Sequence, residues 1–263
     1  MPGANARAME KARTLACDAV ILDLEDAVAP AAKAEARRQV AAAVAAGGFG
    51  RREVVVRVNG ADTPWGAEDL AMAAASRCDA IVLPKVEAAP AIRPGKPLWC
   101  MLETPLGVLR AEAIAAAAGV ECLVMGTSDL TKDLRARHAA DRLPMLASLS
   151  LCLLAARAHG RAILDGVHLD LSDAQGFARA CVQGRELGFD GKTLIHPSQI
   201  DAANAAFGPA PEEAAQARRV LAAFEQAERE GKGVAVLDGR LVENLHVAEA
   251  RRTLALAEAL AAD

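Results

Sequence analysis

The sequence contains no tyrosine, and aromatic residues make up only 3% of its 263 positions. Single-stranded nucleic acids are bound largely by stacking their bases on aromatic side chains, so this composition argues against such a surface. Positive charge is not in excess either, because the net charge is -4 and both signs are dispersed along the chain. Binding of nucleic-acid phosphates requires a basic face. We therefore expect no nucleic-acid partner.

Long apolar segments are also missing, because the longest runs are short or alanine-rich and are interrupted by charges. We expect neither a transmembrane helix nor a secretory signal, and no membrane partner. The six cysteines lie mostly in apolar segments, without CxxC or other metal-binding spacing: Cys17, Cys78, Cys100, Cys122, Cys152 and Cys181. That distribution is typical of buried, reduced thiols, so we expect a cytoplasmic protein.

The dominant pattern is an alternation of apolar strand-like runs with helix-like segments. Strands are expected at 18–26, 53–59, 79–85, 98–103, 121–126, 162–168 and 191–196. Helices are expected at 31–46, 66–77, 107–118, 144–159 and 172–187, and the link 86–96 contains prolines that leave its helix short or missing. Each unit has about the length of a βαβ crossover. The pattern predicts a parallel sheet covered by helices.

Two arrangements of such a sheet remain, an open doubly wound sheet and a closed (β/α)8 barrel, also called a TIM barrel. No GxGxxG motif follows a strand, which counts against a dinucleotide-binding open sheet. Acidic residues and an arginine gather at the carboxyl ends of several strands, which favours the barrel. Because a helix at 6–15 opens the chain, the first of the eight strands is expected to be missing, and the barrel starts late or is open at one seam.

We divide the chain into a barrel domain at 1–208 and a C-terminal extension at 209–263. The extension is predicted to form a helix at 212–230, a hairpin at 234–242 with Asp238-Gly239 at its turn, and a helix at 247–261. A helix–hairpin–helix segment is not needed to close a barrel. We expect it to cover an active site, or to dock on a neighbouring subunit.

Two carboxylates, Glu103 and Asp129, follow the fourth and fifth expected strands. Neighbouring strands lie about 5 Å apart, so the two side chains can share one divalent ion and leave positions for a ligand. Oxygen ligands point to Mg²⁺ or Mn²⁺ rather than zinc. The alternative is that both segments simply cap the helices that follow them.

Charged residues at neighbouring strand ends support this site. Arg57 lies in a β-branched strand, where a buried charge is costly unless paired, so it implies an anionic substrate or a salt bridge to an acid such as Glu25 or Asp26. Asp23, Glu25 and Asp26 form an acidic end to the first strand. Several carboxylates around one ion would repel each other, so we expect some of them to be supporting groups, with Lys85 available to neutralise them.

Eight segments of the chain resemble, in the same order, the motifs of the citrate lyase β-subunit-like family. They are PGANARAMEKA, AVILDLEDAV, VRVNGADTPWG, AIVLPKVE, LETPLGVL, VMGTSDL, FDGKTLIHPSQI and LDGRLVENLH. This family includes malyl-CoA, β-methylmalyl-CoA and citramalyl-CoA lyases and lies within the HpcH/HpaI aldolase superfamily. The resemblance covers essentially the whole chain. The run DRLPMLASLSLCLLAARAHG and the VENLH tail are most similar to the (3S)-malyl-CoA thioesterase branch.

The resemblance implies a Mg²⁺-dependent barrel that acts on a CoA ester as a homotrimer or hexamer. It implies that Glu103 and Asp129 bind the metal, and that Arg57 contacts the substrate and stabilises enolate charge. The family's loop for the keto-acid carboxylate corresponds to Gly126, Thr127 and Ser128.

One position departs from the family pattern. Lyase members carry a catalytic aspartate in the C-terminal hairpin, donated to the neighbouring subunit, and this chain has Glu243 there. Misplacement of a catalytic group by about 1 Å can cost roughly a hundredfold in rate. The first hypothesis is a lyase that splits malyl-, methylmalyl- or citramalyl-CoA into a 2-keto acid and an acyl-CoA. The alternatives are a (3S)-malyl-CoA thioesterase, a non-catalytic subunit of a larger lyase complex, and an aldolase for free keto acids.

Overall fold

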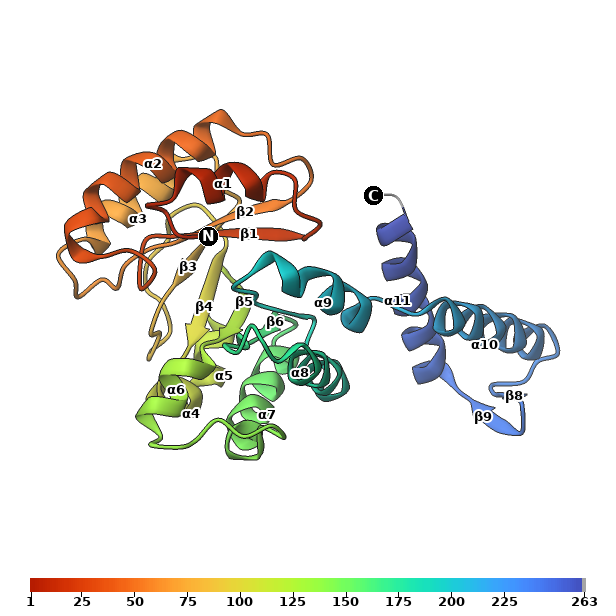
Figure 1. The fold of residues 1–263 in the computed structure, drawn as a ribbon. Coiled ribbons are helices and arrows are strands. Elements are labelled where there is room, and N and C mark those ends of the chain that lie inside the picture. Colours follow the sequence, from red (N-terminus) through yellow and green to blue (C-terminus); the bar gives the residue numbers. More distant parts are fainter. Residues whose placement is uncertain (262–263) are drawn as a thin grey trace. The chain divides into compact units, whose positions relative to one another are not determined.

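The computed structural model describes residues 1–261. Their chain forms two compact units, Met1–Ala203 and a second unit that begins at Asn204. The first unit contains one parallel sheet, in which each strand pairs with the next along the chain (Figure 1). Its strands are β1 (Ala19–Asp23), β2 (Glu53–Arg57), β3 (Ala80–Leu83), β4 (Leu98–Leu102), β5 (Val120–Met125), β6 (Ala162–Asp165) and β7 (Gly191–Lys192).

Helices precede, connect and follow these strands. They are α1 (Ala6–Ala12), α2 (Lys33–Ala46), α3 (Gly66–Ala75), α4 (Pro105–Leu109), α5 (Ala111–Ala116), α6 (Thr127–Asp133), α7 (Leu143–Ala158), α8 (Ala174–Leu187) and α9 (Ile200–Phe207), with 3-10 turns η1 (Pro30–Ala32) and η2 (Pro197–Gln199). Right-handed crossovers between strands in sequential order place the helices on one side of a sheet. Figure 1 shows α2 and α3 on the outer side of β1 and β2, and the sheet is curled. Its inner face is therefore free to carry a core and a site.

An apolar cluster fills that inner face. It comprises Val55, Ala80, Val82, Trp99, Met101, Cys122 and Val124, with Ala19, Ile21 and Leu164 packed against it. Side chains two residues apart on a strand point to the same face. The next inward positions after Ile21, Val55, Met101 and Val124 are Asp23, Arg57, Glu103 and Gly126. The same alternation that builds the core thus ends in a polar layer at the carboxyl ends of the strands.

The predicted parallel α/β sheet is confirmed, but residues 1–261 do not form a closed eight-stranded barrel. In this part of the chain β7 pairs with β6 and not with β1. The free edge of β1 is bordered by Met1 to Gly3, whose Met1 carbonyl accepts the Asp23 amide at 2.8 Å. The Gly3 amide in turn donates to the Asp23 carbonyl at 2.8 Å, beside an isolated bridge between Pro2 and Asp23. Residues 1–3 thus form a single bridge along this edge of β1 instead of a full strand.

Several predicted boundaries were wrong. The sixth and seventh strands are shorter than expected, because they pair only at Leu164–Gly191 and Asp165–Lys192. Beyond this pairing, the Thr193 amide and hydroxyl both donate to the Asp165 carbonyl, at 3.0 and 3.1 Å. The helix expected at 107–118 is two helices, since Arg110 leaves helical geometry with φ -108° and ψ 13°. Helix α1 ends at Ala12 instead of residue 15, and α9 was not expected. The link 86–96 has no helix, as predicted.

The second unit contains α10 (Pro211–Arg229), an antiparallel pair β8 (Ala235–Leu237) and β9 (Arg240–Val242), and α11 (Asn244–Ala261). The hairpin turn is Asp238-Gly239, with φ of 51° and 75°, as a tight Asp-Gly turn requires. A small core holds the unit together: Phe224, Ala227, Ala235, Val242 and Val247. None of the helices within residues 1–261 is long and apolar enough to span a membrane.

Candidate functional site

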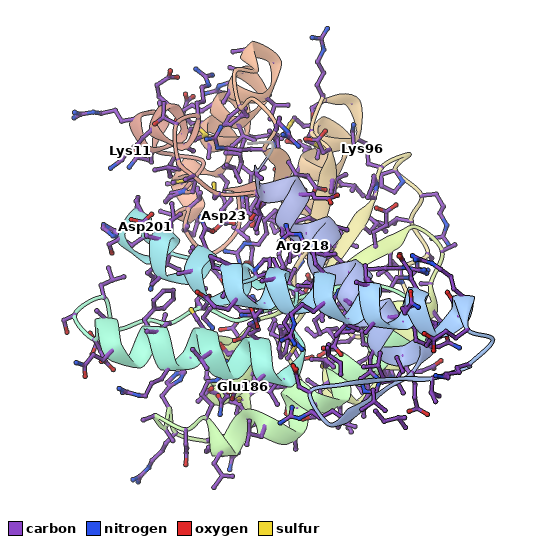
Figure 2. All side chains as sticks on the ribbon, turned by 90° about the vertical axis from the view of Figure 1, so that its right-hand side faces the viewer. Lys11, Asp23, Lys96, Glu186, Asp201 and Arg218 are labelled. Carbon is purple, nitrogen blue, oxygen red and sulfur yellow. The ribbon has the colours of Figure 1, made fainter. Side chains whose placement is uncertain are left out.

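A buried arginine–aspartate pair forms the base of the site. Asp23 and Arg57 end β1 and β2, and the strand register places them directly opposite each other. Arg57 Nε donates to Asp23 Oδ1 at 2.6 Å and Nη2 to Oδ2 at 2.5 Å. Burial alone would raise the pKa of Asp23, but the hydrogen bonds and charge of Arg57 lower it below its ordinary value. In Figure 2 the Asp23 label is near the middle of the view and the Lys11 label is near its edge.

The fork to Asp23 leaves the third guanidinium nitrogen, Nη1, for other contacts. Nη1 lies 3.0 Å from Glu25 Oε2 and 3.7 Å from the Met101 sulfur. The Arg57 side chain is only 14% exposed, and a two-pronged pair of this kind is what makes such burial tolerable. A salt bridge to Glu25 or Asp26 was predicted, and Arg57 does face both, at 3.0 and 4.0 Å. Its main partner is Asp23, because register sets the pairing. The guanidinium is therefore held in one orientation on the inner face.

Glu103 follows β4 and is 3% exposed. Burial raises its pKa to about 7, although the Lys85 amide, which donates to Oε1 at 2.8 Å, opposes the shift. Gly126 makes room for this side chain: a Cβ there would lie 2.3 Å from Glu103 Cβ and 2.5 Å from Oε2. The glycine after β5 is thus needed for the glutamate after β4. A carboxylate that is shielded from solvent and accepts few hydrogen bonds tends to bind either a proton or a cation.

Lys85 joins three elements at this end of the sheet. Its Nζ lies 2.6 Å from Glu25 Oε1, 3.2 Å from Asp129 Oδ2 and 3.8 Å from Asp26 Oδ2. Burial favours the neutral amine, but the hydrogen bond to Glu25 and the surrounding carboxylates raise the pKa of Lys85 above its ordinary value. The ammonium is therefore a permanent positive charge among these acids.

The loop after β5 leads into α6. Thr127 is buried, and Gly166 admits it, because a Cβ at 166 would lie 2.4 Å from Thr127 Oγ1. Ser128 Oγ is buried and finds no hydrogen-bond partner in the described part of the chain. Asp129 lies in the first turn of α6, where the helix dipole favours a carboxylate.

The capping alternative explains only part of this arrangement. Thr104, not Glu103, caps α4, since its side chain accepts the Gly107 amide at 3.0 Å. No side chain caps α6. Capping therefore gives no reason for the burial of Glu103.

Two supporting networks were missed from the sequence. Lys33 Nζ donates to the Leu24 and Glu25 carbonyls at 2.8 and 2.7 Å and to Asn59 Oδ1 at 2.7 Å, which fixes the turn that carries Glu25. Burial lowers the pKa of Lys33. The sequence does place a lysine and an asparagine near the ends of apolar segments. No short-range pattern, however, indicates that positions 33 and 59 are in contact.

The second network ties β6 to β7 and to the loop before α7. Asp165 is fully buried and binds Arg142 Nη1 through both oxygens, at 2.8 and 2.7 Å. Lys192 Nζ lies 2.9 Å from Asp165 Oδ2. Because Leu164 faces the inner cluster, Asp165 points to the helix side of the sheet. We interpret this network as structural.

The structure thus brings together most of the predicted site. Asp23, Glu25, Arg57, Lys85 and Asp129 form one network of contacts, Lys85 also binds Glu103, and Asp26 lies at its exposed rim. Glu243 belongs to the second unit, between β9 and α11, where its amide donates to His246 Nδ1 at 3.0 Å; its role stays a prediction.

Within residues 1–261, no group of three or more His, Cys, Asp or Glu side chains is arranged as a metal centre. The site offers two carboxylates, Glu103 and Asp129. Magnesium sites commonly use one or two carboxylates and complete the shell with water and substrate oxygens. The donor set therefore fits Mg²⁺ better than a metal that needs a full protein cage.

A curled parallel sheet with its charged residues at the carboxyl ends of the strands defines an α/β half-barrel. The family model of HpcH/HpaI aldolase/citrate lyase matches residues 1–94 and 95–197. The chain belongs to this family.

Relatives with two different names share most of its length. The (3S)-malyl-CoA thioesterase of Cereibacter sphaeroides strain KD131 is 54% identical over 268 residues, covering 100% of this chain and 94% of the relative. The citrate lyase subunit beta of Leuconostoc mesenteroides subsp. cremoris is 35% identical over 277 residues, covering 98% and 92%. The crystal structure of CitE from Mycobacterium tuberculosis, in complex with magnesium, acetoacetate and coenzyme A, matches with a TM-score of 0.81 at 33% identity, covering 98% and 96%.

Proposed function

We propose that this chain is a Mg²⁺-dependent thioesterase that hydrolyses (3S)-malyl-CoA to malate and coenzyme A. The observation that carries the proposal is its 54% identity, across the whole chain, to a thioesterase of that name. Similarity to a citrate lyase beta subunit over a comparable length is much lower, at 35%. The hydrolase thus replaces the lyase as the first hypothesis.

Glu103 and Asp129 are the residues we assign to the ion. Glu103 is a nearly inaccessible carboxylate whose pKa is raised to about 7 by burial, and a cation would relieve that cost. Mn²⁺ prefers the same oxygen ligands. When bound, such an ion acts as a Lewis acid and as a template for substrate oxygens. The M. tuberculosis CitE structure contains magnesium, which supports the assignment.

The chain's own residues have distinct roles in the proposed reaction. Arg57, oriented by Asp23, stabilises the negative charge that develops on the thioester carbonyl oxygen. The Thr127 backbone amide, together with the unpartnered Ser128 hydroxyl, binds the free carboxylate of the malyl group. Gly126 shapes this loop, because its own amide donates to the Leu102 carbonyl at 3.1 Å. Glu25, Asp26 and Lys85 support these groups from the neighbouring strand ends.

Glu243 is the carboxylate that we assign to proton transfer. It removes a proton from the attacking water, the new carbon–oxygen bond forms, the carbon–sulfur bond breaks and the coenzyme A sulfur accepts the proton. In this proposal Glu243 is donated by a neighbouring subunit of a trimer or hexamer.

A lyase is the second candidate, because the chain also resembles citrate lyase beta subunits. The same substrate would then split at a carbon–carbon bond into acetyl-CoA and glyoxylate. Arg57 would stabilise the enolate of acetyl-CoA, and Glu243 would donate a proton to its carbon. The two reactions therefore differ in their products while using the same residues.

One assay separates the candidates. Purified protein with Mg²⁺ and (S)-malyl-CoA is followed for free thiol and for glyoxylate in the same sample. The proposal predicts thiol without glyoxylate, lost in EDTA and restored by added Mg²⁺. Glyoxylate without thiol would establish the lyase instead. Absence of both products would favour a non-catalytic subunit.

Glu243 can be tested with a change of one methylene. Glu243→Asp shortens the side chain by about one carbon–carbon bond and is expected to lower thiol release by roughly a hundredfold. Glu249→Asp is the matched control, because Glu249 is exposed on α11, and it should leave the rate unchanged. Equal rates for the two variants would remove Glu243 from the mechanism.

A further inference from the structure

Lys85 contacts both residues assigned to the metal. Its main-chain amide donates to Glu103 Oε1 at 2.8 Å, and its ammonium lies 3.2 Å from Asp129 Oδ2. The same ammonium is 2.6 Å from Glu25 Oε1 and 3.8 Å from Asp26 Oδ2. The Lys85 ammonium therefore lies where three carboxylates converge. Glu25 and Asp26 also face Arg57, at 3.0 and 4.0 Å, whereas Asp129 does not.

The backbone at Lys85 is held in an unusual conformation. Its φ is +48°, in the left-handed region that non-glycine residues rarely adopt. This conformation directs the amide to Glu103 while the side chain reaches Glu25 and Asp129. The two contacts are thus separable: one depends on the backbone and survives substitution, and the other depends on the ammonium.

The Lys85 side chain is also exposed enough to move away from Asp129. It is 44% exposed, whereas Arg57 is 14% exposed and held by the fork to Asp23. Unpaired like charges at close range repel, so the acids need a counter-charge when no divalent ion is bound. An ion bound by Asp129 would lie only a few ångströms from the Lys85 ammonium, and like charges at that distance repel. The ammonium and the ion are therefore alternatives at Asp129.

We propose that Lys85 is an internal counter-ion that competes with the divalent cation for Asp129 and so sets the concentration at which the site fills. This inference rests on the proposed function, because it requires that Glu103 and Asp129 bind the ion. Binding then exchanges one cation for another: the Lys85 ammonium leaves Asp129 as the metal arrives. Such a residue weakens metal binding, whereas a residue that merely oriented Asp129 would strengthen it.

The test is isothermal titration of Mg²⁺ into the intact, metal-stripped protein at pH 8, with Mn²⁺ followed by electron paramagnetic resonance as a second probe. Lys85→Met removes the charge but keeps the amide and an unbranched side chain. Repulsion between a unit charge and a divalent ion about 5 Å apart in a largely aqueous medium predicts a dissociation constant lowered by about tenfold.

Lys132→Met is the matched control. Lys132 is on α6, the helix of Asp129, but its side chain is 79% exposed and its ion pair is with Asp133, at 3.7 Å. Removal of this charge should change the dissociation constant by less than about twofold, since solvent screens it. Lys85→Gln serves in place of Lys85→Met should the methionine variant fail to fold.

An unchanged or weaker affinity in the Lys85 variants, with binding intact in the wild type, would overturn the inference and leave the metal assignment standing. Absence of metal binding in both wild type and variants would contradict the metal assignment itself, and the inference with it. Tighter binding in Lys85→Met alone would support both.

Discussion

Replacement of Glu103 by glutamine should stabilise the fold while it abolishes metal binding. Burial raises the pKa of Glu103 from 4.5 to about 7. At pH 8 the folded protein therefore holds a charged carboxylate that would be more stable in water. At about 1.36 kcal/mol per pKa unit, this shift corresponds to about 3 kcal/mol. The unpaired amide hydrogens of glutamine offset about 1 kcal/mol. The expected gain at pH 8 is therefore about 2 kcal/mol.

The pH dependence distinguishes this cause from better packing. Because the folded pKa lies above the unfolded one, the folded state binds more protons between pH 4.5 and 7, and stability falls as pH rises through that window. At pH 4 the Glu103 side chain is mostly protonated in both the folded and the unfolded protein, so burial of its charge no longer lowers the stability. The difference between Glu103→Gln and wild type should therefore be large at pH 8 and small at pH 4.

The assay is thermal unfolding in EDTA at both pH values, with Glu121→Gln as the control because Glu121 is exposed on β5. For a chain of this size, 2 kcal/mol corresponds to a rise in Tm of about 4–8 °C. Calorimetric Mg²⁺ binding by Glu103→Gln should be lost. A Tm unchanged at pH 8, or raised equally at both pH values, would refute the reasoning.

Two further substitutions test the geometry. Arg57→Lys replaces the fork to Asp23 by a single ammonium and should lower kcat by about a hundredfold, measured as thiol release at saturating substrate; an unchanged kcat would exclude Arg57 from charge stabilisation. Gly126→Ala places a Cβ 2.3 Å from Glu103 Cβ, so Glu103 must shift and Mg²⁺ affinity should fall by about tenfold or more. Gly233→Ala is its control, since a Cβ there meets open space, and equal affinities in the two variants would contradict the predicted displacement.

The alternation of apolar runs predicted the parallel sheet because burial on both faces leaves a local signature at each strand. The same pattern indicated Glu103 and Arg57, because a charged side chain at the end of a buried apolar strand is costly unless it is paired or binds a ligand. The ion-pair partner of Arg57 was harder to predict from the sequence. Arg57 contacts Asp23 more fully than Glu25 because those two positions are opposite in the β1–β2 register, and register depends on the assembled sheet.

Long-range partners were not predictable from the sequence. Lys33 and Asn59 meet across 26 residues, and Arg142 reaches Asp165 across 23, so no local pattern connects them. The length of β7 was overestimated for a related reason: 191–196 has strand-like composition, but β6 pairs with only Gly191 and Lys192. Barrel closure likewise depends on both sheet edges, which lie far apart in the sequence.

In the proposed site, Glu103 and Asp129 bind a divalent ion that displaces Lys85 from Asp129. Crystals grown with Mn²⁺ and measured near the manganese absorption edge test it directly. The expected result is an anomalous peak about 2.1–2.3 Å from a carboxylate oxygen of each acid, with Lys85 Nζ withdrawn from Asp129. A peak elsewhere, or no peak at Mn²⁺ concentrations that saturate binding in solution, would contradict it.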